Sequence, residues 1–226
     1  VIKSIGDLTL VDSKDTDKKG ENCGKIYTET AYTSTATGYA VVEDYGKFTM
    51  ESGLIYAVVG NTPANTGQFG VSVIGEGAVC DINGGKIEAG WFAVAGSGNP
   101  GKGGTTININ EGANLHSAAD YAIYHPQEGV LNINGGKIYG EAGGIDMNDG
   151  VLNVTGGDIF SNGQGNTGNW GDGTGKLGRA AVYFSAKYGD VTATISGGSL
   201  AAADGAVMID EQGKKFDVSC VITGGT

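Results

Sequence analysis

The chain has 226 residues and a formal net charge of -11, from 14 Lys and Arg against 25 Asp and Glu. This acidic balance argues against nucleic acid as a partner, because phosphate binding needs a basic face that displaces counterions. Glycine is abundant (43 residues), 39% of the residues are hydrophobic, and no apolar run approaches the roughly 18 residues of a membrane span.

A short phrase in which apolar and polar residues alternate recurs along the chain, usually before a Gly-Gly pair. Its copies are LTLVDSK from Leu8, FTMESGLI from Phe48, CDINGGKI from Cys80, ININ from Ile107, LNINGGKI from Leu131, LNVTGGDI from Leu152, ATISGGSL from Ala193 and CVITGGT from Cys220. Period-two alternation predicts strands with one buried face, and Gly-Gly predicts a corner because glycine reaches positive φ easily. The inward residues are expected to include Leu131, Ile133, Ile138, Leu152, Val154 and Ile159.

The spacing between copies is elastic, from 21 residues between Ile133 and Val154 to 41 between Val154 and Ile195. A solenoid coil can lengthen at a corner, whereas a helical repeat or a propeller blade keeps its length. A second set of apolar phrases precedes the first: GYAVV from Gly38, FGVSV from Phe69, WFAVA from Trp91, DYAIY from Asp120, GGIDM from Gly143, AAVYF from Ala180 and GAVMI from Gly205. We therefore predict an all-β, right-handed parallel β-helix of about eight coils with about three short strands each, as one domain over residues 1–226.

Two coils are enlarged, at about residues 12–37 and 161–178. The second enlargement contains Trp170, which can stack on a sugar ring or cover the flank of the rod. It also contains Asp172 among amide and hydroxyl residues. This run is only a weak candidate calcium site, because calcium takes about six to eight oxygens and the run offers one carboxylate. Calcium is the one cofactor that the sequence leaves open.

Aligned coils place aromatic and polar residues together on one outward face. Tyr124, Asp146 and Tyr183 are expected on consecutive rungs, in a column that begins Val42, Ser72, Ala95. His125, Asn148 and Lys187 are expected beside them. Aromatic rings with hydrogen-bonding neighbours suit a glycan, so this face and Trp170 form the predicted glycan-binding site. The alternative is an outward face with a few solvated tyrosines.

Two further outward columns consist mainly of amides and hydroxyls. One is Thr49, Asp81, Asn108, Asn132, Asn153 and Thr194; the other is Glu51, Asn83, Asn110, Asn134, Thr155, Ser196 and Thr223. Such side chains can hydrogen-bond along the rod, and we expect them to be structural. The elastic coil lengths argue against an ice-binding lattice.

Catalysis has little support in the sequence. Hydrolysis of a glycosidic bond needs two carboxyl groups about 5 to 10 Å apart, and Asp146 has no second carboxyl group on its face. His116 and His125 have no evident partner, so no catalytic residue is predicted. Of the three cysteines, Cys80 and Cys220 occupy inward positions and are expected to be free thiols.

Repeats of the form T/N-I/V-x-G-G-x-I, joined by phrases such as DYAIYHPQEGVLNINGGKI, resemble pectate-lyase-like β-helix regions of Firmicutes surface or secreted proteins and of their phages. The resemblance implies an adhesin, a carbohydrate-binding module or a spacer, extracellular, on the cell surface or in a virion. A polysaccharide or a cell-surface glycan would be the partner, and one clostridial group binds plant polysaccharides with calcium. The same fold hosts polysaccharide lyases, in which a basic residue acts as base; here only Lys187 or Arg179 could do so.

The last residues, Gly224-Gly225-Thr226, fall inside a repeat phrase. We therefore expect a piece of a longer chain, with neighbours packed end to end against its terminal coils. Two function classes stay open, a glycan-binding or adhesive module and a structural spacer or virion component, with a lyase or hydrolase less expected.

Overall fold

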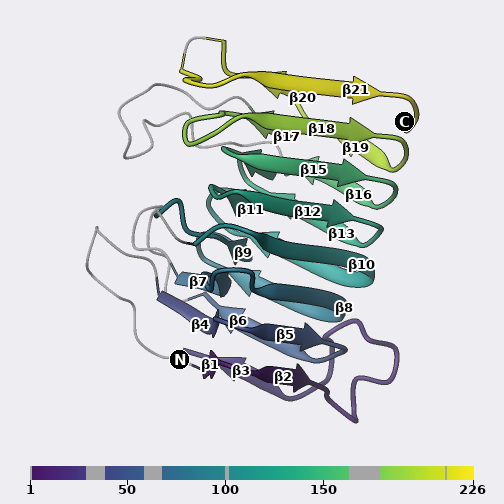
Figure 1. Ribbon diagram of the computed structural model, residues 1–226. Helices are drawn as coiled ribbons and strands as arrows, with labels where there is room; N and C mark the ends of the chain where they lie inside the picture. The colour runs from purple at the N-terminus through teal and green to yellow at the C-terminus, as the bar shows by residue number, and fades with distance from the viewer. Residues whose placement is uncertain (1, 29–38, 59–67, 100–101, 163–178, 212) are drawn as a thin grey trace.

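The computed structural model describes residues 2–28, 39–58, 68–99, 102–162, 179–211 and 213–226. Every regular element in these ranges is a β-strand (Figure 1). The described residues contain no helix of the length and apolarity that crossing a bilayer requires.

The strands form two parallel sheets. The eight-stranded sheet contains, in spatial order, β1 (Ile2–Ser4), β4 (Tyr39–Asp44), β7 (Gln68–Val73), β9 (Val94–Ala95), β11 (Tyr121–His125), β14 (Gly143–Met147), β17 (Ala180–Phe184) and β20 (Gly205–Ile209). The thirteen-stranded sheet contains β2 (Asp7–Leu10), β3 (Lys25–Tyr27), β5 (Lys47–Met50), β6 (Leu54–Ala57), β8 (Val79–Ala89), β10 (Thr105–Ser117), β12 (Gly129–Ile133), β13 (Lys137–Gly140), β15 (Gly150–Val154), β16 (Asp158–Ser161), β18 (Val191–Ile195), β19 (Ser199–Ala201) and β21 (Val218–Ile222).

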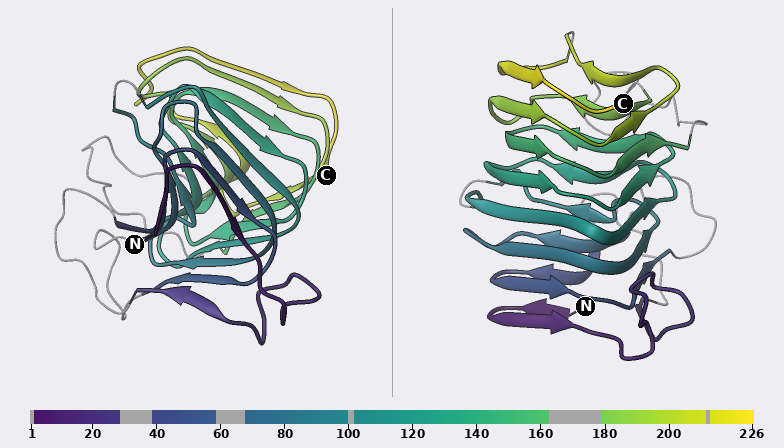
Figure 2. Two further views of the ribbon diagram at one scale, coloured as in Figure 1. Left: turned by 60° about the horizontal axis from the view of Figure 1, so that its bottom comes forward. Right: turned by 90° about the vertical axis from the view of Figure 1, so that its right-hand side faces the viewer.

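Each strand of the eight-stranded sheet is followed along the chain by strands of the other sheet, and we call each such set a rung. For example, β11, β12 and β13 form one rung, and they pair with β14, β15 and β16 of the next. The rungs follow one another from the N-terminal to the C-terminal end (Figure 1 and the right view of Figure 2). This order is compatible with the predicted β-helix, although the two sheets do not close into one.

Glycines make the corner between the two halves of a rung in the thirteen-stranded sheet. Gly136, Gly157 and Gly198 have φ of 82°, 90° and 87°, in the left-handed region that side chains disfavour. A Cβ on Gly157 would also lie 2.8 Å from the carbonyl oxygen of Gly135. The Gly-Gly pairs therefore act as the sequence predicts, and β8 and β10 pass the same corner as single long strands.

The core lies between the sheets and consists of columns of aliphatic side chains. The predicted inward residues Leu131, Ile133, Ile138, Leu152, Val154 and Ile159 are all fully buried, which confirms the assigned register. Cys80 is buried in the same column as Leu131, Cys220 is half-buried on the last rung, and both thiols are free.

The predicted alignment is wrong at its first member. Ser72 pairs with Glu43, not with Val42, and Val42 points into the core. The next charged residue, Asp44, pairs with Val73 and is fully buried. Val41 and Val42 are both buried in the core, as are the equivalent pairs in later rungs, such as Ala122 and Ile123. Strict alternation therefore does not hold in this sheet.

The amide columns form hydrogen-bonded ladders with a fixed direction. Each Asn donates from Nδ2 to Oδ1 of the previous rung: Asn153 to Asn132 (2.9 Å), Asn132 to Asn108 (2.8 Å) and Asn108 to Asp81 (2.7 Å). In the parallel column, Asn134, Asn110 and Asn83 follow the same direction and end on Glu51. A carboxylate suits the first position because it accepts without having to donate.

Ile133→Ala should reduce the free energy of unfolding by about 2 to 5 kcal/mol, because the methyl groups lost lie in a closely packed column. Urea unfolding measures the change. Thr194→Ala, on the exposed side of the same sheet, is the control and should change stability little. A stable Ile133→Ala protein would contradict the register.

Exchange of an amide and a carboxylate should destabilise the protein at Asn132 but much less at Asp81. Asn132→Asp places an acceptor against Asn108 Oδ1 with no donor between them, so we expect a loss of about 1 to 3 kcal/mol. Asp81→Asn still accepts from Asn108 and loses only a 3.7 Å contact with Lys47, which should cost less than about 1 kcal/mol. Equal losses in urea unfolding would show that the direction has no energetic weight.

Candidate functional site

The outer face of the eight-stranded sheet carries the residues predicted to bind a glycan. Tyr124 pairs with Asp146, and Asp146 pairs with Tyr183, so the three lie on consecutive rungs as expected. Asp146 accepts a hydrogen bond from the Ser185 hydroxyl. These three members of the predicted column are therefore confirmed.

The expectation of an open face is wrong, however. The exposed fractions are 6% for Asp146, 1% for Asn148 and 4% for Tyr183. The Phe92 ring stacks on Tyr124 at 4.9 Å between centroids, and the Tyr121 ring lies 6.0 Å from that of Tyr183. Side chains of the chain itself thus occupy much of the aromatic surface that a sugar would need.

Of the remaining predicted residues that the structure describes, Asn148 and Lys187 lie near Asp146, whereas His125 does not lie on this face. His125 points into the core, in register with Met147 and Phe184, and burial lowers its pKa to about 4. Lys187 is half-buried, and burial lowers its pKa although the Asp146 charge opposes the shift. Trp170 and Asp172 lie outside the described residues. Contact of any of these residues with a glycan stays a prediction.

Three buried carboxyl groups accompany this sheet. Burial raises the pKa of Asp120 to about 7, although the Tyr121 N–H and the Trp91 indole donate to it. Burial also raises the pKa values of Asp44 and Asp146 to about 6. Within the described residues, no group of three or more His, Cys, Asp or Glu is placed to hold a metal ion.

These carboxyl groups should make the protein more stable in mild acid. Their folded pKa values exceed the unfolded value of 3.8, so the folded chain binds more protons from about pH 4 to 7, and stability falls as the pH rises through that window. His125 opposes this from about pH 4 to 6.5 but offsets only one group. Thermal unfolding should therefore show a higher Tm at pH 5 than at pH 8.

Asp146→Asn should reduce that difference in Tm, because one of the three proton-binding groups is gone. Asp7→Asn, an exposed carboxyl group, is the matched control and should leave the difference unchanged. A Tm that rises from pH 5 to pH 8 would contradict the assignment.

A second candidate surface lies on the outer side of the thirteen-stranded sheet, beyond the glycine corners. One outward position in successive rungs forms a column that we call the aromatic ladder. Its members, linked by the strand register, are Tyr27, Tyr56, Glu88, His116, Tyr139, Phe160 and Ala201. Glu88 interrupts the rings, and Ala201 ends them.

The rings of the ladder stack face to face. Centroids lie 4.5 Å apart for His116 and Tyr139 and 4.9 Å apart for Tyr139 and Phe160, with the latter pair nearly parallel at 5°. Lys137 Nζ lies 4.7 Å from the Tyr139 centroid and 5.4 Å from that of Phe160, close enough for cation–π attraction. The ladder thus presents ring edges and an ammonium group to solvent.

At the interruption, Glu88 contacts Lys86 of its own strand and His116, the ladder residue of the next rung. Its carboxylate lies 2.5 Å from Lys86 Nζ and 2.6 Å from His116 Nδ1. Burial alone would raise the pKa of Glu88, but the hydrogen bonds from His116 and Lys86 lower it to about 2. Glu88 is therefore ionised at neutral pH and fixes the orientation of the His116 ring.

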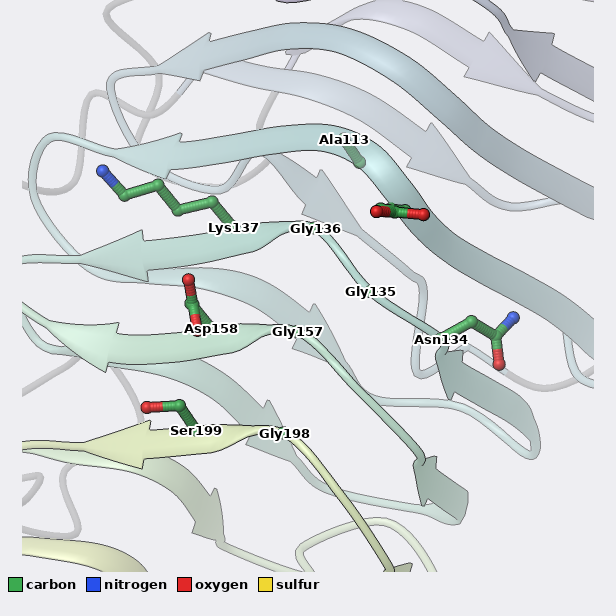
Figure 3. A pocket seen from close by; sticks show the side chains of 10 residues that line it. Ala113, Asn134, Gly135, Gly136, Lys137, Gly157, Asp158, Gly198 and Ser199 are labelled. Carbon is green, nitrogen blue, oxygen red and sulfur yellow. The ribbon is translucent and has the colours of Figure 1, made fainter. Parts of the chain in front are cut away.

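Figure 3 shows an open groove along the stacked glycine corners. The groove is lined by Lys137, Asp158 and Ser199, each two residues before a ladder position. It has a volume of about 610 Å³. Its polar lining comes from four consecutive rungs and consists of Glu111, Asn134, Lys137, Asp158 and Ser199. The groove offers acceptors, donors and one cation, a mixture that suits a ligand with many hydroxyl groups.

Sequence reasoning missed this surface, although its signal is present. The apolar pieces Lys137-Ile138-Tyr139 and Asp158-Ile159-Phe160 have their Ile inward and their aromatic residue outward. The pattern G-G-x-I-Y/F thus predicts an outward ring after each corner that has it.

The comparisons with known proteins add no further evidence: no protein-family model matches the chain, and neither the curated proteins nor the solved structures contain a match.

Proposed function

We propose that the chain is a right-handed parallel β-helix that serves as a rigid, non-catalytic module of an extracellular or cell-surface protein and binds a polysaccharide along its outside. The observation that carries the proposal is the open groove beside the aromatic ladder. The groove takes polar side chains from four rungs in register, from Glu111 on β10 to Ser199 on β19.

The dimensions suit an extended chain of sugars. Three rung steps of about 4.8 Å give a groove of roughly 14 Å, the length of a short oligosaccharide. Hydroxyl groups of such a ligand can donate to Glu111 and Asp158 and accept from Lys137. The groove is open, so few groups are buried on binding, and we expect affinity in the micromolar to millimolar range.

The face of Tyr124, Asp146 and Tyr183 is the less favoured location. Its carboxylate is already bonded to Ser185, and its rings lie against Phe92 and Tyr121. A sugar would have to displace these contacts, whereas the groove is accessible as it stands. A spacer or virion component needs neither surface and is the alternative that binding experiments separate from this proposal.

Isothermal titration with neutral and uronic-acid oligosaccharides tests the proposal. The double variant Asn134→Ala, Lys137→Ala removes a hydrogen-bonding group and the cation from the groove and should weaken binding about tenfold or more. Phe216→Ala, an exposed ring outside both candidate surfaces (42%), is the control and should bind as the parent does. Tm measurements establish that each variant is folded.

Failure of the parent chain to bind any oligosaccharide would refute glycan binding and favour the spacer. Binding that survives the groove substitutions but is lost in Tyr124→Ala or Tyr183→Ala would move the site to the eight-stranded sheet.

A further inference from the structure

We infer that the last ring of the aromatic ladder, Phe160, forms a stacking subsite for one neutral pyranose ring, held in the place that a ring at position 201 would fill. The inference rests on the proposed function and deepens it by naming the subsite and the class of sugar.

The geometry follows from the register. Phe160 is parallel to Tyr139 within 5° at 4.9 Å, so one of its faces is covered and the other looks along the rod toward the next rung. The partner of Phe160 on that rung is Ala201, an exposed methyl group. In the part of the chain that the structure describes, no ring stacks on this second face of Phe160.

Lys137 does not cover this face either. Its Nζ lies 4.7 Å from the Tyr139 centroid and 5.4 Å from the Phe160 centroid, while the two centroids are 4.9 Å apart. These three similar distances place the ammonium group beside the pair of rings, on the Tyr139 side of Phe160. A group on the far face would lie much farther from Tyr139.

Polar groups flank the open face. Asp158 and Ser199 come two residues before Phe160 and Ala201 in their strands and pair with each other in register. Residues two apart in a strand share a face, so both side chains lie on the same outer surface as the open ring, at the edge of the groove (Figure 3). The subsite therefore combines an aromatic wall, a small floor, a carboxylate and a hydroxyl group.

This combination selects a particular ligand chemistry. A pyranose ring has C–H groups that pack on an aromatic face and equatorial hydroxyl groups at its rim. The rim hydroxyl groups can donate to Asp158 and exchange hydrogen bonds with Ser199. A uronic acid would bring its carboxylate near that of Asp158, so the subsite favours a neutral sugar.

Two substitutions test the subsite from opposite sides. Ala201→Phe extends the ladder by one ring and fills the space, so it should weaken binding of neutral gluco-, manno- or xylo-oligosaccharides about tenfold or more without lowering the Tm. Phe160→Leu keeps an apolar side chain but removes the flat face, and it should weaken binding to a similar extent. Ala203→Phe, exposed and just beyond β19, is the matched control and should bind as the parent does.

A second measurement does not depend on a variant. The parent is labelled at its alanine methyl groups and titrated with a neutral oligosaccharide. The NMR chemical shift of the Ala201 methyl group should change more than that of Ala203. Binding that is weakened by the groove variant but unchanged in both Ala201→Phe and Phe160→Leu would overturn the subsite and leave the proposed function in place. Stronger binding of uronic-acid than of neutral oligosaccharides would overturn the assigned sugar class. Absence of binding by the parent would instead overturn the proposed function.

Discussion

In-register pairing between equivalent strands of neighbouring rungs is the constraint on which the rest of the structure depends. It places each residue about 4.8 Å from its equivalent in the next rung, a spacing close to the contact distance of aliphatic chains, of amides and of aromatic rings. The same register therefore builds the buried Leu131 column, the Asn132 ladder and the stack of Tyr139 on Phe160. Like residues stack because the backbone has already brought them to the distance at which they attract.

In-register stacking has different consequences for charged side chains than for neutral ones. A column of amides satisfies itself, because each amide can donate and accept, and it needs one acceptor such as Asp81 at its first rung. Glu88 is tolerated within the aromatic ladder because Lys86 of its own strand and His116 of the next rung both contact its carboxylate. At Asp120 and Asp146, by contrast, burial outweighs the hydrogen bonds that the carboxyl groups accept and raises their pKa values. Much of the chain's acidic excess therefore remains at exposed positions.

The alternation of apolar and polar residues was sufficient to predict which residues of the thirteen-stranded sheet point into the core. Alternation in LNINGGKI and LNVTGGDI fixes which residues point inward, because one face of each strand must be buried. It could not predict the exposure of the outer face, which depends on side chains from other segments, such as Phe92 packed on Tyr124. It also failed in the eight-stranded sheet, where two successive residues of a strand, such as Val41 and Val42, both lie in the core. The aromatic ladder was not predicted, because Glu88 and Ala201 stand at two of its positions in place of a ring, although both keep the strand register.

Those interruptions bear on where a regular stack of rungs can bind a ligand. Inside an unbroken column each side chain uses its two faces on its neighbours, so little surface is left for another molecule. A free face arises only where a small residue follows a large one, as Ala201 follows Phe160. One substitution can open or close such a site without disturbing the backbone, since the strands pair through main-chain groups. Recognition in this architecture is therefore expected at breaks in a column, and the regular columns supply the rigidity that holds those breaks in place.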